Sequence, residues 1–69
     1  MGDPRLGSRL KEARTTAGLT QQGLADKAGV SRKTINTVEN GVFVPSTVLA
    51  LELARALETT VETLFFLKD

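Results

Sequence analysis

The sequence predicts an all-α fold, a compact bundle of five short helices. Apolar residues recur at helical spacing along most of the chain, and Ser or Thr stands immediately before four of these apolar segments. Alternation typical of a β-strand reaches no useful length, so we expect helices and loops without strands. A chain of 69 residues with 41% hydrophobic and 25% charged residues fits one small globular domain over residues 1–69 and excludes solvated disorder.

The first helix is predicted over residues 5–17. Gly18 follows this segment at the position where the left-handed end of a helix is expected, because glycine adopts that conformation without a steric penalty. Apolar residues recur in this segment at the four, three and four spacing of one helix face, namely Leu6, Leu10, Ala13 and Ala17.

Two further helices, over residues 21–28 and 32–40, are joined by a very short connection. Thr20 and Ser31 are good N-caps, because a hydroxyl oxygen can accept from the free N–H groups of the first turn. Gly29 ends the earlier helix, and a single residue separates it from the next N-cap. Helices joined so tightly must cross steeply, which predicts a helix-turn-helix unit. Its core-facing residues are Leu24, Ala25, Ala28, Val30, Ile35 and Val38.

The last two helices are predicted over residues 47–57 and 61–66, with Ser46 and Thr60 as N-caps. Pro45 ends the loop before them, since the residue preceding a proline is pushed away from helical dihedrals. The residues expected to face the core are Leu49, Ala50, Leu53, Ala54, Ala56, Leu57, Leu64 and Phe65.

The sequence contains neither Cys nor His, which excludes disulfides, thiolate nucleophiles and histidine bases or ligands. Its carboxylates are scattered, and it has no glycine-rich phosphate loop. We therefore expect no enzyme, no cofactor, no metal site and no small-molecule ligand. Apolar runs of four residues fall far short of the ~20 that a membrane helix needs, and the first residues lack signal-peptide features, so we expect a cytoplasmic chain without a membrane partner.

Charge is unevenly distributed although the net charge is only +1. Residues 1–33 carry a net +4 and residues 34–69 a net −3. A basic pole can attract a polyanion while an acidic pole keeps other surfaces away from it. An imbalance of this size also arises by chance in a short chain, so charge alone leaves the partner open.

Segments spread along the chain match, in order and spacing, the pattern of a known family. They are Leu19-Thr20-Gln21-Gln22, Leu24-Ala25, Ala28-Gly29-Val30-Ser31, Thr34-Ile35, Val38-Glu39-Asn40-Gly41, Pro45-Ser46, Ala54 and Ala56-Leu57. Over residues 5–65 the chain resembles the Cro and repressor-like (XRE-like) family of helix-turn-helix DNA-binding transcriptional regulators. The resemblance implies a lambda-repressor-like domain whose third helix lies in the major groove of double-stranded DNA.

The resemblance implies that Arg32, Lys33 and Thr37 contact base edges. Side-chain chemistry agrees, because Arg and Lys can pair with guanine while Thr offers a hydroxyl, and a methyl for thymine. Asn36 is the next candidate for base contact, since its amide can pair with adenine, although it could instead approach the sugar-phosphate wall. The phosphate contacts that the resemblance implies come from Gln21, Thr34 and Asn40.

Arg14 has two alternative roles. The resemblance pairs it with Glu39, which makes it a structural residue, and the alternative is direct contact with DNA. The other basic residues near the first helix, Arg5, Arg9 and Lys11, either add long-range attraction to DNA or form a solvated helix face.

Three features depart from the family pattern. Gly23 stands where a helix former such as Glu is usual, which costs about 1 kcal/mol of helix propensity. Glu58 replaces the usual glycine after the fourth helix, so we expect strain or a different shape there. The loop residues 42–44 are apolar where relatives often carry Lys or Arg, which leaves backbone N–H groups as the phosphate donors of this loop.

More apolar side chains are present than a core of this size can easily bury. Such a surplus often marks a contact surface, so we expect a homodimer that places two recognition helices about 34 Å apart. The alternative is that Phe43 folds back as a lid on the core and Phe66 belongs to a frayed tail. The candidate dimer contacts are Phe43, Val48, Leu51, Phe66 and Leu67.

These observations predict a sequence-specific double-stranded DNA-binding transcriptional regulator that acts as a homodimer, most simply as a repressor. The alternative is a protein-interaction module on the same fold, of the antitoxin or co-activator bridging type. The polar face of the third helix favours DNA, whereas the nearly neutral net charge favours the interaction module.

Overall fold

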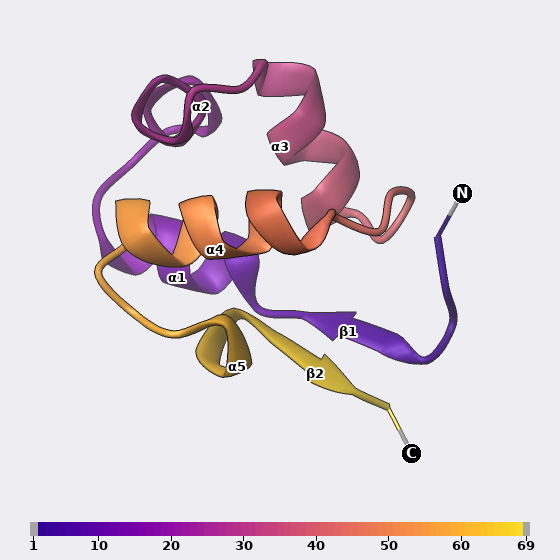
Figure 1. Ribbon diagram of the computed structural model, residues 1–69. Coiled ribbons are helices and arrows are strands. Elements are labelled where there is room, and N and C mark those ends of the chain that lie inside the picture. The colour runs from indigo at the N-terminus through magenta and orange to yellow at the C-terminus, as the bar shows by residue number, and fades with distance from the viewer. Residues whose placement is uncertain (1, 69) are drawn as a thin grey trace.

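A computed structural model describes residues 2–68 and contains the five predicted helices and one small sheet (Figure 1). The helices are α1 (Leu10–Thr16), α2 (Gln21–Ala28), α3 (Arg32–Glu39), α4 (Thr47–Ala56) and α5 (Val61–Leu64). The strands are β1 (Leu6–Ser8) and β2 (Phe65–Leu67). Within residues 2–68, no helix has the length and apolar character that crossing a membrane requires.

The helix-turn-helix unit of α2 and α3 forms as its local sequence predicts. The Thr20 hydroxyl accepts from the Gly23 N–H at 2.9 Å, and the Ser31 hydroxyl accepts from the Thr34 N–H at 3.1 Å. Gly29 ends α2 with a φ of 72°, in the left-handed region that favours glycine. Each cap satisfies an N–H group that the first helical turn leaves without a partner.

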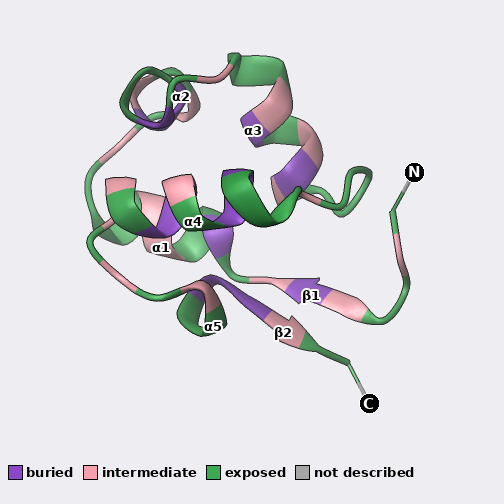
Figure 2. Ribbon diagram, viewed as in Figure 1, coloured by how far each residue is buried: buried purple, intermediate pink, exposed green. Residues whose placement is uncertain are grey.

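The core lies between the helices, where the buried sides of α2, α3 and α4 face one another (Figure 2). The predicted apolar stripes supply it, and Leu64 and Phe65 close it from the carboxyl-terminal side. The buried residues are Leu10, Leu24, Ala25, Ala28, Ile35, Val38, Leu49, Ala50, Leu53, Ala54, Leu64 and Phe65.

The expectation that the chain contains no strand is wrong. Antiparallel β1 and β2 pair Leu6 with Leu67 and Gly7 with Phe66, so the helix predicted over residues 5–17 begins at Leu10 and the one predicted over 61–66 ends at Leu64. A three-residue strand is too short to show a pattern of alternation, and its partner comes from the opposite end of the chain. Leu6 packs against the core from β1, which explains why its spacing from Leu10 resembled a helix face.

Phe66 lies over the sheet and is not part of a frayed tail. Its ring covers Gly7 on the neighbouring strand, where a Cβ would overlap the ring. The Arg9 guanidinium stands 4.1 Å from the centroid of the same ring, close enough for a cation–π interaction. This alternative for Phe66 is therefore wrong.

The corner after α4 has the strain that replacement of its usual glycine predicts. Glu58 has a φ of 55° and is the one non-glycine residue with a positive φ in the described part of the chain. Hydrogen bonds from the Glu58 and Thr59 N–H groups to the carbonyls of Arg55 and Ala54 hold this conformation. The same corner is made by glycine after α1 and α2.

Candidate nucleic-acid interface

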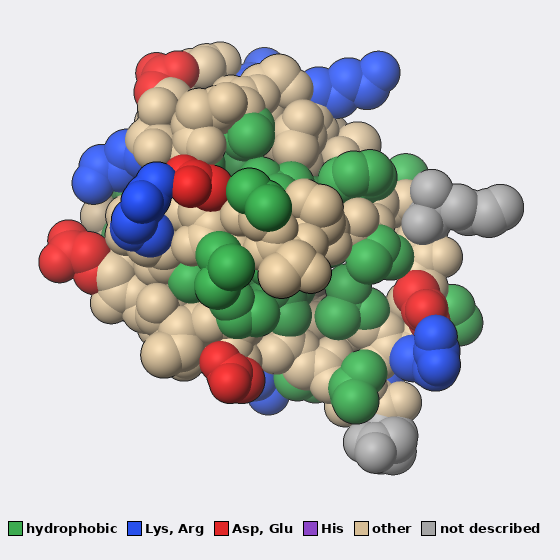
Figure 3. All heavy atoms as spheres, in the orientation of Figure 1, with side chains coloured by type: hydrophobic (Ala, Val, Ile, Leu, Met, Phe, Trp, Pro, Cys, Tyr) green, Lys and Arg blue, Asp and Glu red, His purple; other side chains and the backbone are tan. Residues whose placement is uncertain are grey.

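The outer face of α3 is polar, and much of it is open to solvent. Ile35 and Val38 are buried against the core, whereas the side chains at the opposite face point outward. In the space-filling view, Lys and Arg side chains project beyond the surface near the start of α3 (Figure 3). The exposed residues of this face are Arg32, Lys33, Asn36 and Asn40, with Thr34 and Thr37 half-buried.

Arg32 and Lys33 follow the N-cap of α3 and form neither ion pairs nor side-chain hydrogen bonds within residues 2–68. Together with Gln21 and Asn36 they line a shallow hollow of about 360 Å³ between the start of α2 and α3. Both cationic groups are therefore available to an external partner. Across residues 2–68 there is no group of three side chains that could hold a metal ion.

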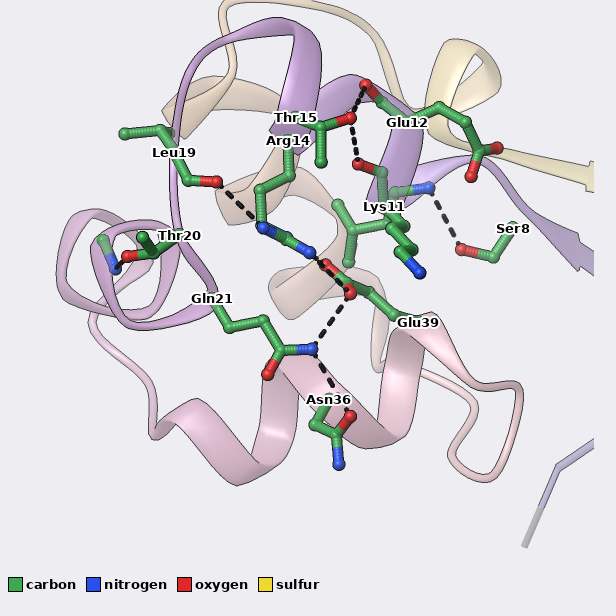
Figure 4. Close-up of polar contacts among 12 residues, drawn as sticks. Ser8, Lys11, Glu12, Arg14, Thr15, Leu19, Thr20, Gln21, Asn36 and Glu39 are labelled. Atoms are coloured by element: carbon green, nitrogen blue, oxygen red, sulfur yellow. Dashed lines mark hydrogen bonds and ion pairs between the residues drawn. The ribbon is translucent and has the colours of Figure 1, made fainter.

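Arg14 and Glu39 form the ion pair that the family resemblance implies (Figure 4). The Nε of Arg14 donates to a carboxylate oxygen of Glu39 at 2.6 Å, and Nη1 donates to the carbonyl of Leu19 at 2.9 Å. The two side chains are 11% and 2% exposed. Buried charges are stable when they are paired and hydrogen-bonded, so Arg14 joins α1 to α3 and to the start of the helix-turn-helix unit.

A chain of hydrogen bonds runs from this ion pair to the outer face of α3. The Nε2 of Gln21 donates to Glu39 at 3.1 Å and to the Oδ1 of Asn36 at 3.3 Å (Figure 4). Asn40 donates to the same Asn36 oxygen at 2.8 Å. Sequence reasoning placed these residues on DNA separately and missed their connection. The four-residue spacing of Asn36 and Asn40 was the one available signal.

This network limits what Asn36 and Gln21 can offer to DNA. The Oδ1 of Asn36 already accepts two hydrogen bonds, and an amide oxygen has two lone pairs. Paired contact with adenine needs that oxygen as an acceptor, so Asn36 keeps only its N–H donors for a partner. Both N–H groups of the Gln21 side chain are likewise engaged, whereas the backbone N–H of Gln21, at the start of α2, has no hydrogen-bond partner within residues 2–68.

The hydroxyls of the two threonines on α3 also have partners within the chain. The Thr37 hydroxyl donates to the carbonyl of Thr34 at 3.0 Å, and the Thr34 and Ser31 hydroxyls lie 2.9 Å apart. A Thr37 side chain fixed in this way offers a base its methyl group and the acceptor lone pairs of its hydroxyl oxygen.

The apolar loop after α3 is attached to the end of that helix. The N–H groups of Val42 and Phe43 donate to the carbonyl of Thr37, and the N–H of Gly41 donates to Val38. The expectation that the backbone N–H groups of residues 42–44 are free for phosphate is therefore wrong at Val42 and Phe43. Phe43 is exposed, and within residues 2–68 it does not pack on the core. The alternative in which Phe43 folds back as a lid on the core is therefore wrong as well.

The basic residues near α1 have neighbours of their own. Arg5 pairs with Asp3 at 2.8 Å, and its hydrogen bonds lower the pKa of the Asp3 carboxyl to about 2. Arg9 stands over Phe66, and Lys11 is solvent-exposed. This arrangement favours the solvated-face alternative for these residues.

A second surface is apolar and lies on α4. Val48 and Leu51, two of the candidate dimer contacts, are 70% and 56% exposed. Leu51 and Val44 border a groove of about 840 Å³ between α4, α5 and the strands. Hydrophobic side chains gather over α4 and in the hollow below it (Figure 3).

Comparison with known proteins gives consistent matches. A family model described as a helix-turn-helix domain matches residues 5–64. An uncharacterised HTH-type transcriptional regulator of Bacillus subtilis is 36% identical over 62 residues, covering 90% of this chain and 94% of the relative. Another from Methanothermobacter thermautotrophicus is 43% identical over 61 residues, covering 87% and 88%.

Two solved structures have the same fold. The restriction-modification controller protein C.AhdI from Aeromonas hydrophila superposes with a TM-score of 0.76 at 41% identity, over 78% of this chain and 82% of that one. A chain of the SinR protein/SinI protein complex gives a TM-score of 0.75 at 28% identity, over 80% and 54%. These matches agree with the prediction that the protein is not an enzyme, and the chain belongs to the helix-turn-helix domain family of transcriptional regulators.

Proposed function

We propose that this protein binds double-stranded DNA sequence-specifically as a homodimer, with α3 in the major groove, and represses transcription by occupying promoter DNA. The observation that carries the proposal is the outward polar face of α3, where Arg32 and Lys33 are exposed and have no ion-pair partner within residues 2–68. An exposed cationic and amide face on a helix of this size matches the donor and acceptor pattern of the major groove.

The residues of this face divide into two groups. Arg32 and Lys33 read guanine, Thr37 offers a methyl group, and Asn36 contributes its N–H donors. Register on the duplex comes from phosphate contacts, which do not depend on sequence. We assign these contacts to Gln21, through its free backbone N–H at the start of α2, and to Thr34 and Asn40.

The size of the molecule supports binding as a pair. Its Cα atoms span 30 × 21 × 20 Å, less than the roughly 34 Å between successive major-groove sites on one side of the duplex. One copy therefore reads one half-site. The exposed Val48 and Leu51 on α4 are our choice for the surface that joins two copies, because they belong to neither the core nor the polar face of α3.

Selection from a random duplex library tests the proposal. We expect a palindromic consensus with a guanine in each half-site and half-sites one helical turn apart. Arg32→Ala should weaken binding to that site by about 1–3 kcal/mol and relax preference at one base pair.

Arg55→Ala is the matched control, because it removes an exposed arginine that is paired on α4, away from α3. It should leave the consensus unchanged. An equal loss from Arg32→Ala on every duplex would contradict its role in reading bases.

A protein-interaction module is the second candidate, and the apolar groove beside α4 favours it. One structural neighbour was solved as the SinR protein/SinI protein complex, with a second protein bound. A folded protein that enriches no duplex from the library would support this function instead.

A further inference from the structure

The polar face of α3 adjoins a small notch with apolar walls. Its lining comes from both α3 and the loop that follows, and its volume is about 290 Å³. Its loop residues, Val42 and Phe43, are 56% and 41% exposed, so they present apolar surface beside the polar face of α3. The lining residues are Lys33, Thr34, Thr37, Val42 and Phe43.

Backbone hydrogen bonds hold the two walls of the notch together. The carbonyl of Thr37 accepts from the N–H of Val42 at 3.0 Å and from the N–H of Phe43 at 3.3 Å. Gly41, at a φ of 73°, turns the chain back toward α3. The backbone that carries the apolar side chains of the loop is therefore held in place relative to Thr37.

The notch has an apolar interior and a cationic rim. The Thr37 hydroxyl donates its proton to the carbonyl of Thr34, so Thr37 lines the notch without a free hydrogen-bond donor. The backbone N–H groups of Val42 and Phe43, the two loop residues that line the notch, are also engaged, so neither offers a donor there for phosphate. Lys33 stands on the rim and also lines the hollow that contains Arg32, so the notch continues the proposed DNA-reading face.

We propose that this notch reads the 5-methyl group of a thymine, with Phe43 and Thr37 as specificity-determining residues. The thymine methyl is the apolar group that base pairs present in the major groove. An apolar site with a lysine at its rim suits that methyl on a polyanion better than it suits a phosphate or a base edge. The inference rests on the proposed DNA binding and names a base that the arginine and lysine contacts would not select.

Replacement of thymine by deoxyuridine provides the test, because it removes the methyl and leaves every hydrogen-bonding group in place. Each thymine of the selected duplex is replaced singly, and affinity is measured by fluorescence anisotropy. We expect one position in each half-site to lose about fourfold in affinity, the value of burying one methyl-sized group. The other thymines should tolerate the replacement.

Two substitutions link this loss to the notch. Thr37→Ser removes the methyl and keeps the hydroxyl that bonds Thr34, and Phe43→Ser removes the opposite wall. In both variants the deoxyuridine penalty should fall below twofold. Val44→Ser is the control, because Val44 is 42% exposed in the same loop but lines the groove beside α4. It should keep the fourfold penalty.

The ratio of affinities for the two duplexes is compared within each variant, so changes in folding or dimerisation cancel. The inference is overturned if no thymine shows a penalty, or if the penalty persists in both Thr37→Ser and Phe43→Ser. A Phe43→Ser variant that binds all duplexes more weakly with an unchanged penalty would assign Phe43 to the sugar-phosphate wall. Failure of the library to yield any duplex would instead count against the proposed function.

Discussion

Glu58 adopts a left-handed backbone conformation that non-glycine residues rarely adopt. Glycine occupies the left-handed position after α1, α2 and α3, with φ between 72° and 75°, and Glu58 occupies the equivalent position after α4. A Cβ in this conformation approaches the following carbonyl and costs roughly 1–2 kcal/mol. The corner is formed because Thr59 and the core residue Ala54 are already hydrogen-bonded across it.

Glu58→Gly should raise the free energy of unfolding by about 1 kcal/mol, because it removes the Cβ penalty. Thermal unfolding followed by far-UV circular dichroism should show a midpoint several degrees higher. Glu58→Ala is the control, since it removes the charge and keeps the Cβ. An equal gain from alanine would assign the effect to charge.

The Arg14–Glu39 ion pair stabilises the side chains at the polar face of α3. Glu39 accepts from both Arg14 and Gln21, and it is almost fully buried. Loss of the Glu39 charge leaves Arg14, which water barely reaches, without an anionic partner. The same change removes the anchor that orients Gln21 toward Asn36.

Glu39→Gln should lower the free energy of unfolding by about 3 kcal/mol. Glu52→Gln is the control, because it breaks the solvent-exposed pair with Arg55 and should cost under about 0.5 kcal/mol. Urea unfolding of both variants makes the comparison. Similar losses in the two variants would show that burial does not strengthen the Arg14–Glu39 pair.

At the scale of elements, the two-stranded sheet joins the ends of the described chain. Besides the Gly7–Phe66 pair, the N–H of Arg9 donates to Leu64 and the N–H of Lys68 donates to Arg5. Three-residue strands gain little from their ladder alone. Cross-strand contact between the Phe66 ring and Gly7, which has no side chain to displace the ring, therefore adds to the stabilisation of the sheet.

Gly7→Ala should destabilise the protein by about 1–3 kcal/mol, because the new methyl displaces the Phe66 ring and its contact with Arg9. In a Phe66→Ala background the same change should cost little. Urea unfolding of the single and double variants measures this coupling. Additive losses would show that Gly7 acts independently of Phe66.

At the scale of the whole molecule, two surfaces are separate. The polar face of α3 and the apolar residues of α4 share no side chain, and the loop between the helices contributes to both, with Phe43 on the notch and Val44 on the groove. A dimer joined through α4 would leave both α3 faces uncovered. Pairing two copies adds their contacts with DNA, which strengthens binding without any new contact within either copy.

Val48→Asp combined with Leu51→Asp should convert a dimer to a folded monomer, because both side chains are exposed and contribute little to the core. Light scattering at micromolar concentration measures the mass, and affinity for the selected palindrome should fall at least tenfold. Ala17→Asp, at an exposed position after α1, is the control. An unchanged mass in the double variant would exclude α4 as the joining surface.

Helices α2, α3 and α4 could be predicted nearly to the residue because their signals are local. Thr20, Ser31 and Ser46 cap the following turns, and Gly29 supplies the left-handed end of α2. A cap or a left-handed glycine depends on residues within one turn of itself. The strands could not be predicted, since a pairing such as Leu6 with Leu67 joins opposite ends of the chain.

The candidate site also has features that the local sequence predicts and features that depend on tertiary contacts. Helical period by itself determines that Ile35 and Val38 face the core and that the polar residues of α3 face away from it, because that period is a property of the chain. Only the tertiary structure decides that Gln21 occupies the acceptor of Asn36 and that the loop places Phe43 beside Thr37. These contacts depend on how α2 crosses α3 and where the loop returns, and the packing of the whole core sets both.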